Sequence, residues 1–306
     1  MIKEILTMLS GNDNPVNSQT KEKIEQQEKE TELIGNCFVF TSPAGGTGVS
    51  TVVSEIANIL STKYHKRTCI VEASQTGSSQ FSKYLIKAKN QLEYDEDTIK
   101  VKKEKSIADF LLAFNPVDEN EDMKLSEVIL ELDKNLYLTT FASSDIKSTF
   151  NVDYVKYIKY LEVLKNYFDI VLIDMHWNPA FEGCVGSVES ATIVYTLLDD
   201  STDLTPYYRM KNFFALTGSS YKFKNIILTK VSDEQFVKQF INHTKDINLI
   251  TTIPYLFIIE ENKNKKSIDL NMNTREKKLF NNSLEEIIQS LFKGVINKEN
   301  KKEGEI

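Results

Sequence analysis

The 306-residue chain is poor in the residues that form disulfide frameworks and metal clusters. Its three cysteines (Cys37, Cys69 and Cys184) are odd in number and widely spaced, which argues against a disulfide framework or a Cys-x-x-Cys metal site and is typical of a reducing cytosol. The three histidines are too scattered to indicate a metal cluster. The chain is long enough to bury a sizeable core, so we expect its stability to come from packing.

Long apolar runs and long basic runs are also missing. No stretch approaches the roughly 18 apolar residues that a membrane-spanning helix needs. The first residues, MIKEILTMLSG, are too short and too charged for a signal peptide. The formal net charge is -7, so bulk electrostatics do not favour nucleic acid or an anionic membrane. These absences predict a cytoplasmic protein that does not bind nucleic acid directly.

Composition divides the chain into tails and one domain. Residues 1–35 are rich in Glu, Lys and Gln, which predicts a solvated tail or linker, although IKEILTML near its start fits either a small docking helix or a frayed terminus. Residues 298–306 predict a disordered tail. The remainder, 36–297, predicts an α/β domain. Its charged segment 87–134, around the apolar patch IADFLLAF, predicts an insertion or lid-like elaboration.

Inside the domain, short β-branched runs alternate with amphipathic helical stretches. The predicted strands span residues 37–42, 68–73, 136–141, 169–175, 191–198, 223–231 and 249–255. The predicted helices span residues 50–64, 152–168, 203–216, 233–244 and 274–296. This alternation predicts a mostly parallel central sheet with helices on both faces. Such a sheet binds its ligands at the carboxyl ends of the strands.

A glycine-rich stretch, SPAGGTGVSTV, joins the first predicted strand to the first predicted helix. A strand, a glycine-rich turn and a helix N-terminus together form an anion site, because backbone N–H groups converge there and the helix dipole adds partial positive charge. Gly45, Gly46 and Gly48 permit close backbone approach and positive φ. Ser50 and Thr51 lie where a phosphate loop places hydroxyls for magnesium and phosphate.

The stretch lacks the lysine of an ordinary phosphate loop. The pattern G-x-x-x-x-G-K-[ST] would place lysine at position 49 and glycine at position 43, where this chain has Val49 and Pro43. AGGTGVST (Ala44–Thr51) nevertheless resembles the deviant Walker A motif K-G-G-x-G-K-[ST]-T of the MinD/ParA family of P-loop NTPases, in the SIMIBI class. It departs from that motif at both lysines, which are Ala44 and Val49 here. The second departure is similar to the TadZ/CpaE branch, whose loops resemble K-G-G-x-G-[ATV]-[ST]-T.

Four further stretches resemble that family in order and spacing. TCIVEASQTGSSQFSKYL resembles its second strand and switch I, with Glu72 and Ser74 where active ATPases have roughly D-x-D. YFDIVLIDMHWNP resembles its Walker B-like strand and places Asp174 at the carboxylate position. NIILTKVSD resembles the strand whose end meets the base, with Thr229 in place of a frequent asparagine. TTIPYL resembles the closing strand, so the resemblance spans residues 36–256.

The resemblance implies ATP and Mg²⁺ as cofactors. The implied nucleotide-binding residues are Gly45, Gly46, Thr47, Gly48, Val49, Ser50, Thr51 and Thr229. The implied metal site consists of Ser50, Asp174 and Glu72, since an aspartate at the end of a buried strand beside a phosphate loop suits water-mediated magnesium. Glu72 fits a cap of the following turn equally well.

The departures from the motif predict binding with little hydrolysis. Loss of the lysine at position 49 removes charge that would stabilise the β- and γ-phosphates, and hydrolysis depends on that charge more than binding does. Ser74 lacks the water-orienting carboxylate, and Ala44 lacks the contact across a dimer. Absence of binding and a competent ATPase remain the alternatives, and no catalytic residue is assigned. Arg209 and Lys211 either supply charge or lie on a solvated helix face.

The resemblance implies a localisation or assembly factor of a tight-adherence (Flp-type) pilus or secretion system. It further implies a homodimer through the nucleotide face, with proteins of that machinery as partners. Residues 283–296 fit an amphipathic helix that binds the inner face of the membrane peripherally, and they fit the last helix of an α/β domain. An active ParA/MinD-type positioning ATPase and a regulatory adaptor on the same fold are the competing functions.

Five other residues have weaker functional interpretations. His176 and Trp177 fit either stacking on a ligand or, for Trp177, packing in the core. Asp199 and Asp200 end a predicted strand and fit surface carboxylates. Cys184 has no neighbouring His–Asp pattern, so no cysteine nucleophile is predicted.

Overall fold

The computed structural model describes residues 35–73, 107, 111, 128–141, 153–199, 204–244, 247–255 and 274–293. The strands are β1 (Cys37–Ser42), β2 (Thr68–Ala73), β3 (Leu130–Asp133), β4 (Leu136–Thr140), β5 (Ile170–His176), β6 (Ile193–Asp199), β7 (Asn225–Val231) and β8 (Asn248–Pro254). The helices are α3 (Val49–Thr62), α7 (Tyr154–Tyr167), α8 (Glu182–Ser190), α9 (Leu204–Ala215), α10 (Glu234–His243) and α12 (Thr274–Lys293), with a short 3-10 helix, η2 (Ser220–Lys222).

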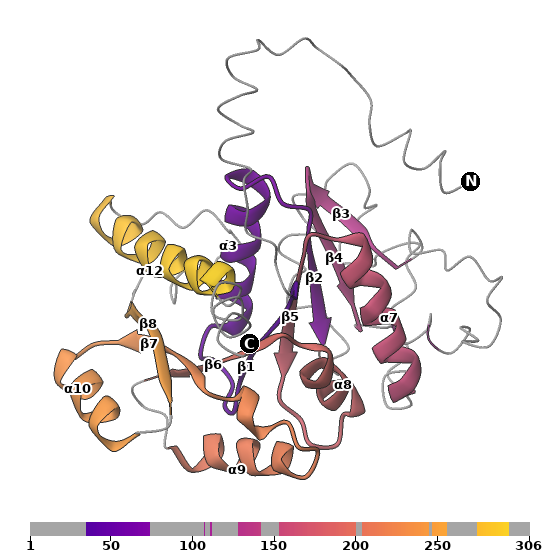
Figure 1. Ribbon diagram of the computed structural model, residues 1–306. Helices are drawn as coiled ribbons and strands as arrows, with labels where there is room; N and C mark the ends of the chain where they lie inside the picture. The colour runs from indigo at the N-terminus through magenta and orange to yellow at the C-terminus, as the bar shows by residue number, and fades with distance from the viewer. Residues whose placement is uncertain are drawn as a thin grey trace, which may run out of the picture.

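One sheet organises the described residues (Figure 1). Its strands lie in the order β3-β4-β2-β5-β1-β6-β7-β8. Neighbouring strands run parallel from β4 to β8, and only β3, at the edge, pairs antiparallel with β4. The crossovers place the carboxyl ends of β1, β2, β5 and β6 along the same edge, which confirms the predicted fold class.

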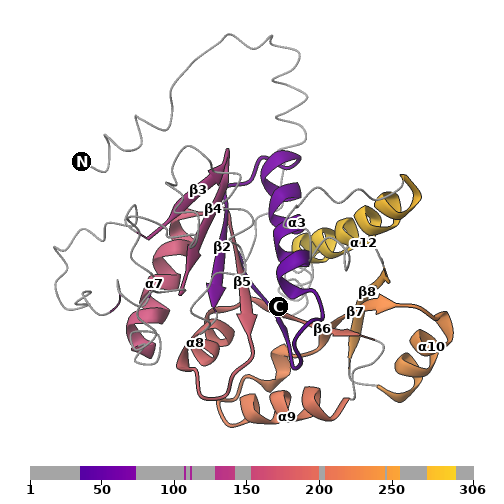
Figure 2. The ribbon, with the colours of Figure 1, turned by 180° about the vertical axis from the view of Figure 1, so that it is seen from behind.

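Helices cover both faces of this sheet, as Figures 1 and 2 show. Successive side chains of a strand point to opposite faces. On β1, Cys37 and Val39 therefore join the core beneath α7, α8, α9 and α10, whereas Phe38 and Phe40 join the core beneath α3 and α12. We call these two sides the α7 face and the α3 face. Burial on both sides explains why the central strands are mostly apolar in sequence.

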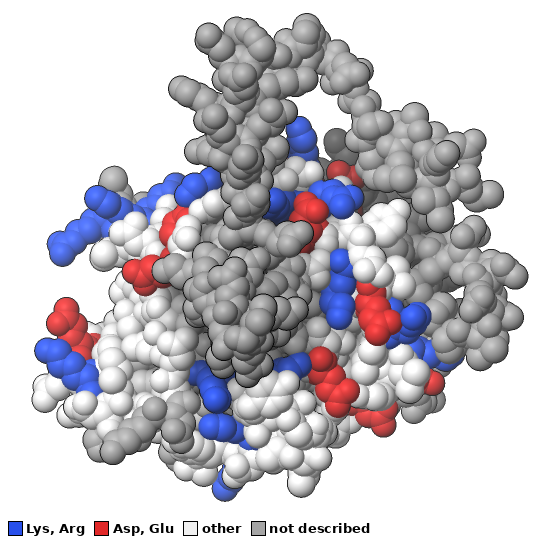
Figure 3. Space-filling model, viewed as in Figure 1, with Lys and Arg blue, Asp and Glu red and all other residues white. Residues whose placement is uncertain are grey.

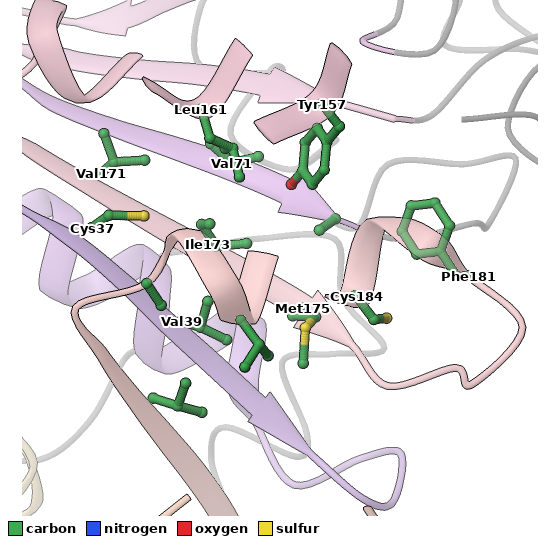
Figure 4. Packing of buried hydrophobic residues seen from close by; sticks show 14 of the residues in the cluster. Cys37, Val39, Val71, Tyr157, Leu161, Val171, Ile173, Met175, Phe181 and Cys184 are labelled. Atoms are coloured by element: carbon green, nitrogen blue, oxygen red, sulfur yellow. The ribbon is translucent and has the colours of Figure 1, made fainter. Parts of the chain in front are cut away.

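The core on the α7 face is shown in Figure 4. Val71, Val171 and Ile173 project from neighbouring strands toward Leu161 of α7, and all four are fully buried. Complete burial of a side chain of this size stabilises the fold by roughly 1.5–3 kcal/mol. The apolar patch of the predicted insertion contributes two more buried side chains, at positions 107 and 111.

Among the described residues, one strand and one α-helix were not predicted by the sequence analysis, nor was the short η2. The strand is β3, LELD, which is short and has only one residue in four buried. The helix is α8, EGCVGSVES, which is rich in glycine and serine and so has weak intrinsic helix propensity. Gly186 has a packing reason, because a Cβ there would lie 2.9 Å from Cδ1 of Tyr157 on α7. Close packing of α8 on α7 thus requires a residue without a side chain.

The predicted tails lie outside the described residues, apart from Gly35, which precedes β1. Most of the predicted insertion at 87–134 also lies outside them. The insertion and the domain boundaries therefore stay predictions.

The C-terminal helix α12 completes the core on the α3 face. Its inward side chains are buried: Phe280, Leu284, Ile287, Ile288 and Leu291. Ser283 donates to the Thr252 carbonyl at 2.9 Å, and the hydroxyls of Ser290 and Tyr195 are 2.9 Å apart. Figure 3 shows Lys and Arg side chains on the outer side of α12. The helix is therefore docked as the last helix of an α/β domain, with its apolar face covered.

Within the described residues, no helix is both long and apolar enough to cross a membrane.

Candidate nucleotide site

The glycine-rich loop leaves β1 at Ser42 and enters α3 at Val49. Two of its glycines need left-handed backbone: φ is 83° at Gly46 and 89° at Gly48. Residues with a side chain rarely adopt positive φ, which explains why both positions are glycine. A Cβ added at Gly46 or Gly48 would meet no described atom within 4 Å. The loop is consequently open where a ligand would approach its backbone.

The N-terminus of α3 is suited to an anion. Gly48 occupies the N-cap position and offers no side chain to bond the first N–H groups. The first turn carries no acidic residue. Helix N-termini that keep unpaired N–H groups and an uncompensated dipole attract phosphate.

A hydrogen bond joins this helix to the predicted Walker B-like strand. Ser50 Oγ donates to Asp174 Oδ2 at 2.6 Å. Asp174 is 7% exposed, on β5. Burial raises its pKa to about 7, the charge of Glu72 adds to the rise, and the Ser50 bond opposes it. Asp174 therefore favours a proton or a cation as its partner.

Glu72 and Asp174 are neighbours in the sheet. They are paired in register on β2 and β5, and Glu72 is 1% exposed. On its other side, β2 pairs with β4, where Thr140 lies in register with Glu72 and donates to Glu72 Oε2 at 2.5 Å. Two adjacent buried carboxylates repel each other, so a shared proton or a cation lowers their free energy.

Oxygen ligands of this kind suit magnesium, which commonly keeps several waters and takes one or two carboxylates. In the described part of the chain, no three or more His, Cys, Asp or Glu side chains are grouped so that they could hold a metal ion. The structure brings Ser50, Asp174 and Glu72 together, and their oxygen atoms fit a hydrated Mg²⁺, whose binding here stays a prediction. Thr140 was missed, because only the pairing of β4 with β2 brings it to Glu72.

Neither missing lysine is replaced by a cation within the loop. Ala44 is exposed, and its N–H donates to Ser42 Oγ at 3.2 Å. Val49 is partly buried and packs against the core of the α3 face. The residue at the Walker lysine position therefore contributes to packing. Arg209, on α9, is exposed, as expected for a solvated helix face.

Thr229 and Thr47 lie in contact. Thr229, 3% exposed on β7, donates its hydroxyl to the Thr47 carbonyl at 2.8 Å. Thr47 is 2% exposed, and its own hydroxyl has no partner within the described residues. The resemblance implied that Thr229 meets a base, but the contact in the structure is with the phosphate loop.

The remaining candidates fall outside this cluster. Trp177 packs edge-on against Phe213, with ring centroids 5.0 Å apart, which supports the packing interpretation. Cys184 is buried, and burial raises its pKa to about 12, which is unfavourable for a nucleophile. Ser74 and Asp200 lie outside the described residues.

No protein-family model and no curated protein matches the sequence. Solved structures do match the fold. A putative plasmid partition protein from Borrelia burgdorferi, bound to AMPPNP, is 17% identical, with a TM-score of 0.63 over 84% of this chain and 99% of its own. The fold is that of MinD and ParA-family ATPases.

Two further MinD and ParA structures agree with that assignment. The MinD protein of Pyrococcus horikoshii, complexed with Mg-ADP, is 16% identical, with a TM-score of 0.59 over 82% of this chain and 95% of its own. A ParA family ATPase from Chlorobium tepidum is 14% identical, with a TM-score of 0.60 over 82% of this chain and 99% of its own. At these identities the likeness to MinD and ParA is one of fold.

Proposed function

We propose that this protein binds ATP and Mg²⁺ at the β1–α3 loop and hydrolyses ATP slowly or not at all. The observation that carries the proposal is the 2.6 Å bond from Ser50, in the first turn of α3, to the buried Asp174. It joins the anion-binding loop to a carboxylate pair. Neighbours of the same fold bound to AMPPNP and Mg-ADP support the choice of ligand.

Each part of the site has a role in this proposal. Backbone N–H groups from Gly45 to Thr51 receive the phosphates, aided by the dipole of α3. Ser50, Asp174 and Glu72 hold hydrated Mg²⁺, which when bound neutralises charge on the β- and γ-phosphates. Val49 contributes only its backbone N–H.

Slow hydrolysis follows from the missing charge. Phosphoryl transfer depends on positive groups aimed at the charge that develops in the transition state. Ala44 and Val49 supply none, and Ser74 lacks the carboxylate that would orient water. Ground-state binding retains the backbone amides, so affinity falls less than turnover. The protein is thus a pseudo-ATPase in this proposal.

In the cell, the protein would act as a TadZ/CpaE-like localisation or assembly factor of a pilus or secretion system. The support is the loop, whose Val49 resembles that branch. The role implies a homodimer through the nucleotide face and protein partners from that machinery. One solved structure of the same fold is a MinC:MinD cell division protein complex from Aquifex aeolicus. Peripheral membrane association would need a surface other than the buried face of α12.

An active ParA/MinD-type positioning ATPase is the second candidate, because the Ser50–Asp174 pair of such a site is intact. A regulatory adaptor on the same fold is the third, and it needs no turnover either.

Calorimetric titration with Mg-ATP, beside a turnover assay, tests the proposal. We expect saturable binding that weakens at least tenfold in Asp174→Ala, and turnover far below one per minute. No binding at millimolar ATP would refute the nucleotide site. Efficient turnover that Asp174→Ala abolishes would establish the positioning ATPase instead. Leu279→Ala is the matched control, since this side chain is 46% exposed on α12.

A further inference from the structure

The contact between β7 and the phosphate loop has an unusual construction. The Thr229 hydroxyl lies 2.8 Å from the Thr47 carbonyl oxygen and 3.4 Å from the Leu198 carbonyl oxygen. Thr229 is 3% exposed, so water competes little for the bond. A loop carbonyl is thereby held by a side chain 182 residues away in the sequence.

The end of β7 is shaped around this contact. Lys230, the next residue, has φ of 56°, in the left-handed region that residues with a side chain rarely adopt. The register between β7 and β8 also shifts between Leu228 and Val231. Strained backbone conformations persist only where the surrounding structure holds them in place. Such conformations are common at functional sites. The strain here falls directly beside Thr229.

Peptide geometry connects this bond to ligand binding. The Thr47 carbonyl and the Gly48 N–H belong to one planar, trans peptide unit, in which the two groups point in opposite directions. A donor that fixes the direction of the Thr47 carbonyl therefore fixes the direction of the Gly48 N–H. Gly48 has φ of 89° and can rotate more freely than other residues, so this restraint is needed.

We propose that Thr229 is a positioning residue that aims the Gly48 N–H at a bound phosphate group and does not read the base. The inference rests on the proposed function, because it concerns the same loop. A loop without either lysine depends on its backbone N–H groups for affinity, so their orientation has a larger effect here.

Substitutions of similar size separate two possible roles of Thr229, fixing the loop carbonyl and contacting the base. Thr229→Val removes the donor, Thr229→Ser keeps it, and Thr229→Cys leaves a weak donor in case the valine variant does not fold. Thr196→Val is the matched control. Thr196 is fully buried on neighbouring β6, and its hydroxyl has no partner among the described residues.

The ligands are Mg-tripolyphosphate, which has no base, Mg-ATP and Mg-GTP, each titrated calorimetrically. We expect Thr229→Val to weaken all three by the same factor, on the order of tenfold, as for a lost buried hydrogen bond. Thr229→Ser and Thr196→Val should bind like the wild type, with Thr229→Cys between. A loss confined to ATP or GTP, with tripolyphosphate unaffected, would show that Thr229 reads the base and would overturn the proposal.

Amide hydrogen exchange without ligand is the second readout, measured on the peptide that contains Gly45–Ser50. Thr229→Val should increase exchange there and Thr196→Val should not. Unchanged exchange in Thr229→Val would overturn the proposal whatever the affinities are. If the wild type binds none of the three ligands, the nucleotide site is refuted, and the exchange result alone decides whether Thr229 fixes the loop.

Discussion

Replacing Asp174 with asparagine should make the metal-free protein more stable at pH 8. Asp174 is buried beside Glu72, and its pKa rises from 3.8 to about 7 on folding. The folded state therefore binds the proton more tightly than the unfolded chain does. The stability that this protonation contributes is present near pH 4 and is lost as the pH rises to about 7. Asparagine keeps an oxygen for Ser50 and cannot ionise.

The magnitude follows from the shift. A difference of about 3 units, at about 1.4 kcal/mol per unit, gives at most about 4 kcal/mol at pH 8. Coupling to Glu72 and local relaxation reduce this, so we expect Asp174→Asn to gain about 2–4 kcal/mol there. Near pH 4 the gain should fall below about 1 kcal/mol, because the wild-type carboxyl is then largely neutral when folded.

Urea unfolding measures this gain, for wild type and Asp174→Asn between pH 4 and pH 8 in EDTA. The gain is the difference between the two free energies of unfolding at each pH, and taking this difference removes most contributions of other titrating groups. Ser50→Ala removes the hydrogen bond that lowers the pKa of Asp174, so this pKa should rise further. The loss of stability of the Ser50→Ala protein with rising pH should therefore continue to a higher pH than in the wild type. Adding Mg²⁺ at pH 8 should stabilise the wild type and not Asp174→Asn. The same pH dependence in wild type and Asp174→Asn would refute the reasoning.

Three other substitutions have expected outcomes. Val49→Lys should increase ATP affinity about tenfold, measured calorimetrically, because it restores a charge at the β- and γ-phosphates; unchanged affinity would mean that the loop holds no phosphate there. Leu284→Ala should reduce the free energy of unfolding by about 2–5 kcal/mol, since this side chain of α12 is fully buried. Leu279→Ala, on the exposed side of the same helix, should change it by less than about 0.5 kcal/mol. Equal effects of the two substitutions in urea unfolding would contradict the docked position of α12. Gly186→Ala should destabilise the protein by about 1–2 kcal/mol, because overpacking against Tyr157 outweighs a gain of about 1 kcal/mol in helix propensity. A higher melting temperature of the variant would show that α8 and α7 can move apart to make room for the methyl group.

Much of the fold could be predicted because its signals are local. The central strands are buried on both faces, so each is mostly apolar and can be recognised from its own segment. The loop is equally visible, since φ above zero requires glycine at Gly46 and Gly48. Edge strand β3 has one buried residue and no such signal. Helix α8 was not predicted because glycine and serine lower its helix propensity, and the close packing of Gly186 on α7 cannot be seen in the sequence.

The sequence by itself determined the class of the sheet, through the alternation of strands and helices along the domain. It also determined the place of the glycine-rich loop and the absence of both lysines, because these features lie within a few consecutive residues. Only the tertiary structure decided which distant groups meet there. Register between separate strands places Thr140 beside Glu72, and the bent end of β7 places Thr229 against Thr47. The amphipathic pattern of residues 283–296 fitted a membrane surface as well as a protein core, since both bury an apolar stripe, and only the modest basic charge favoured the core. Packing against β8 and α3 decided for the core.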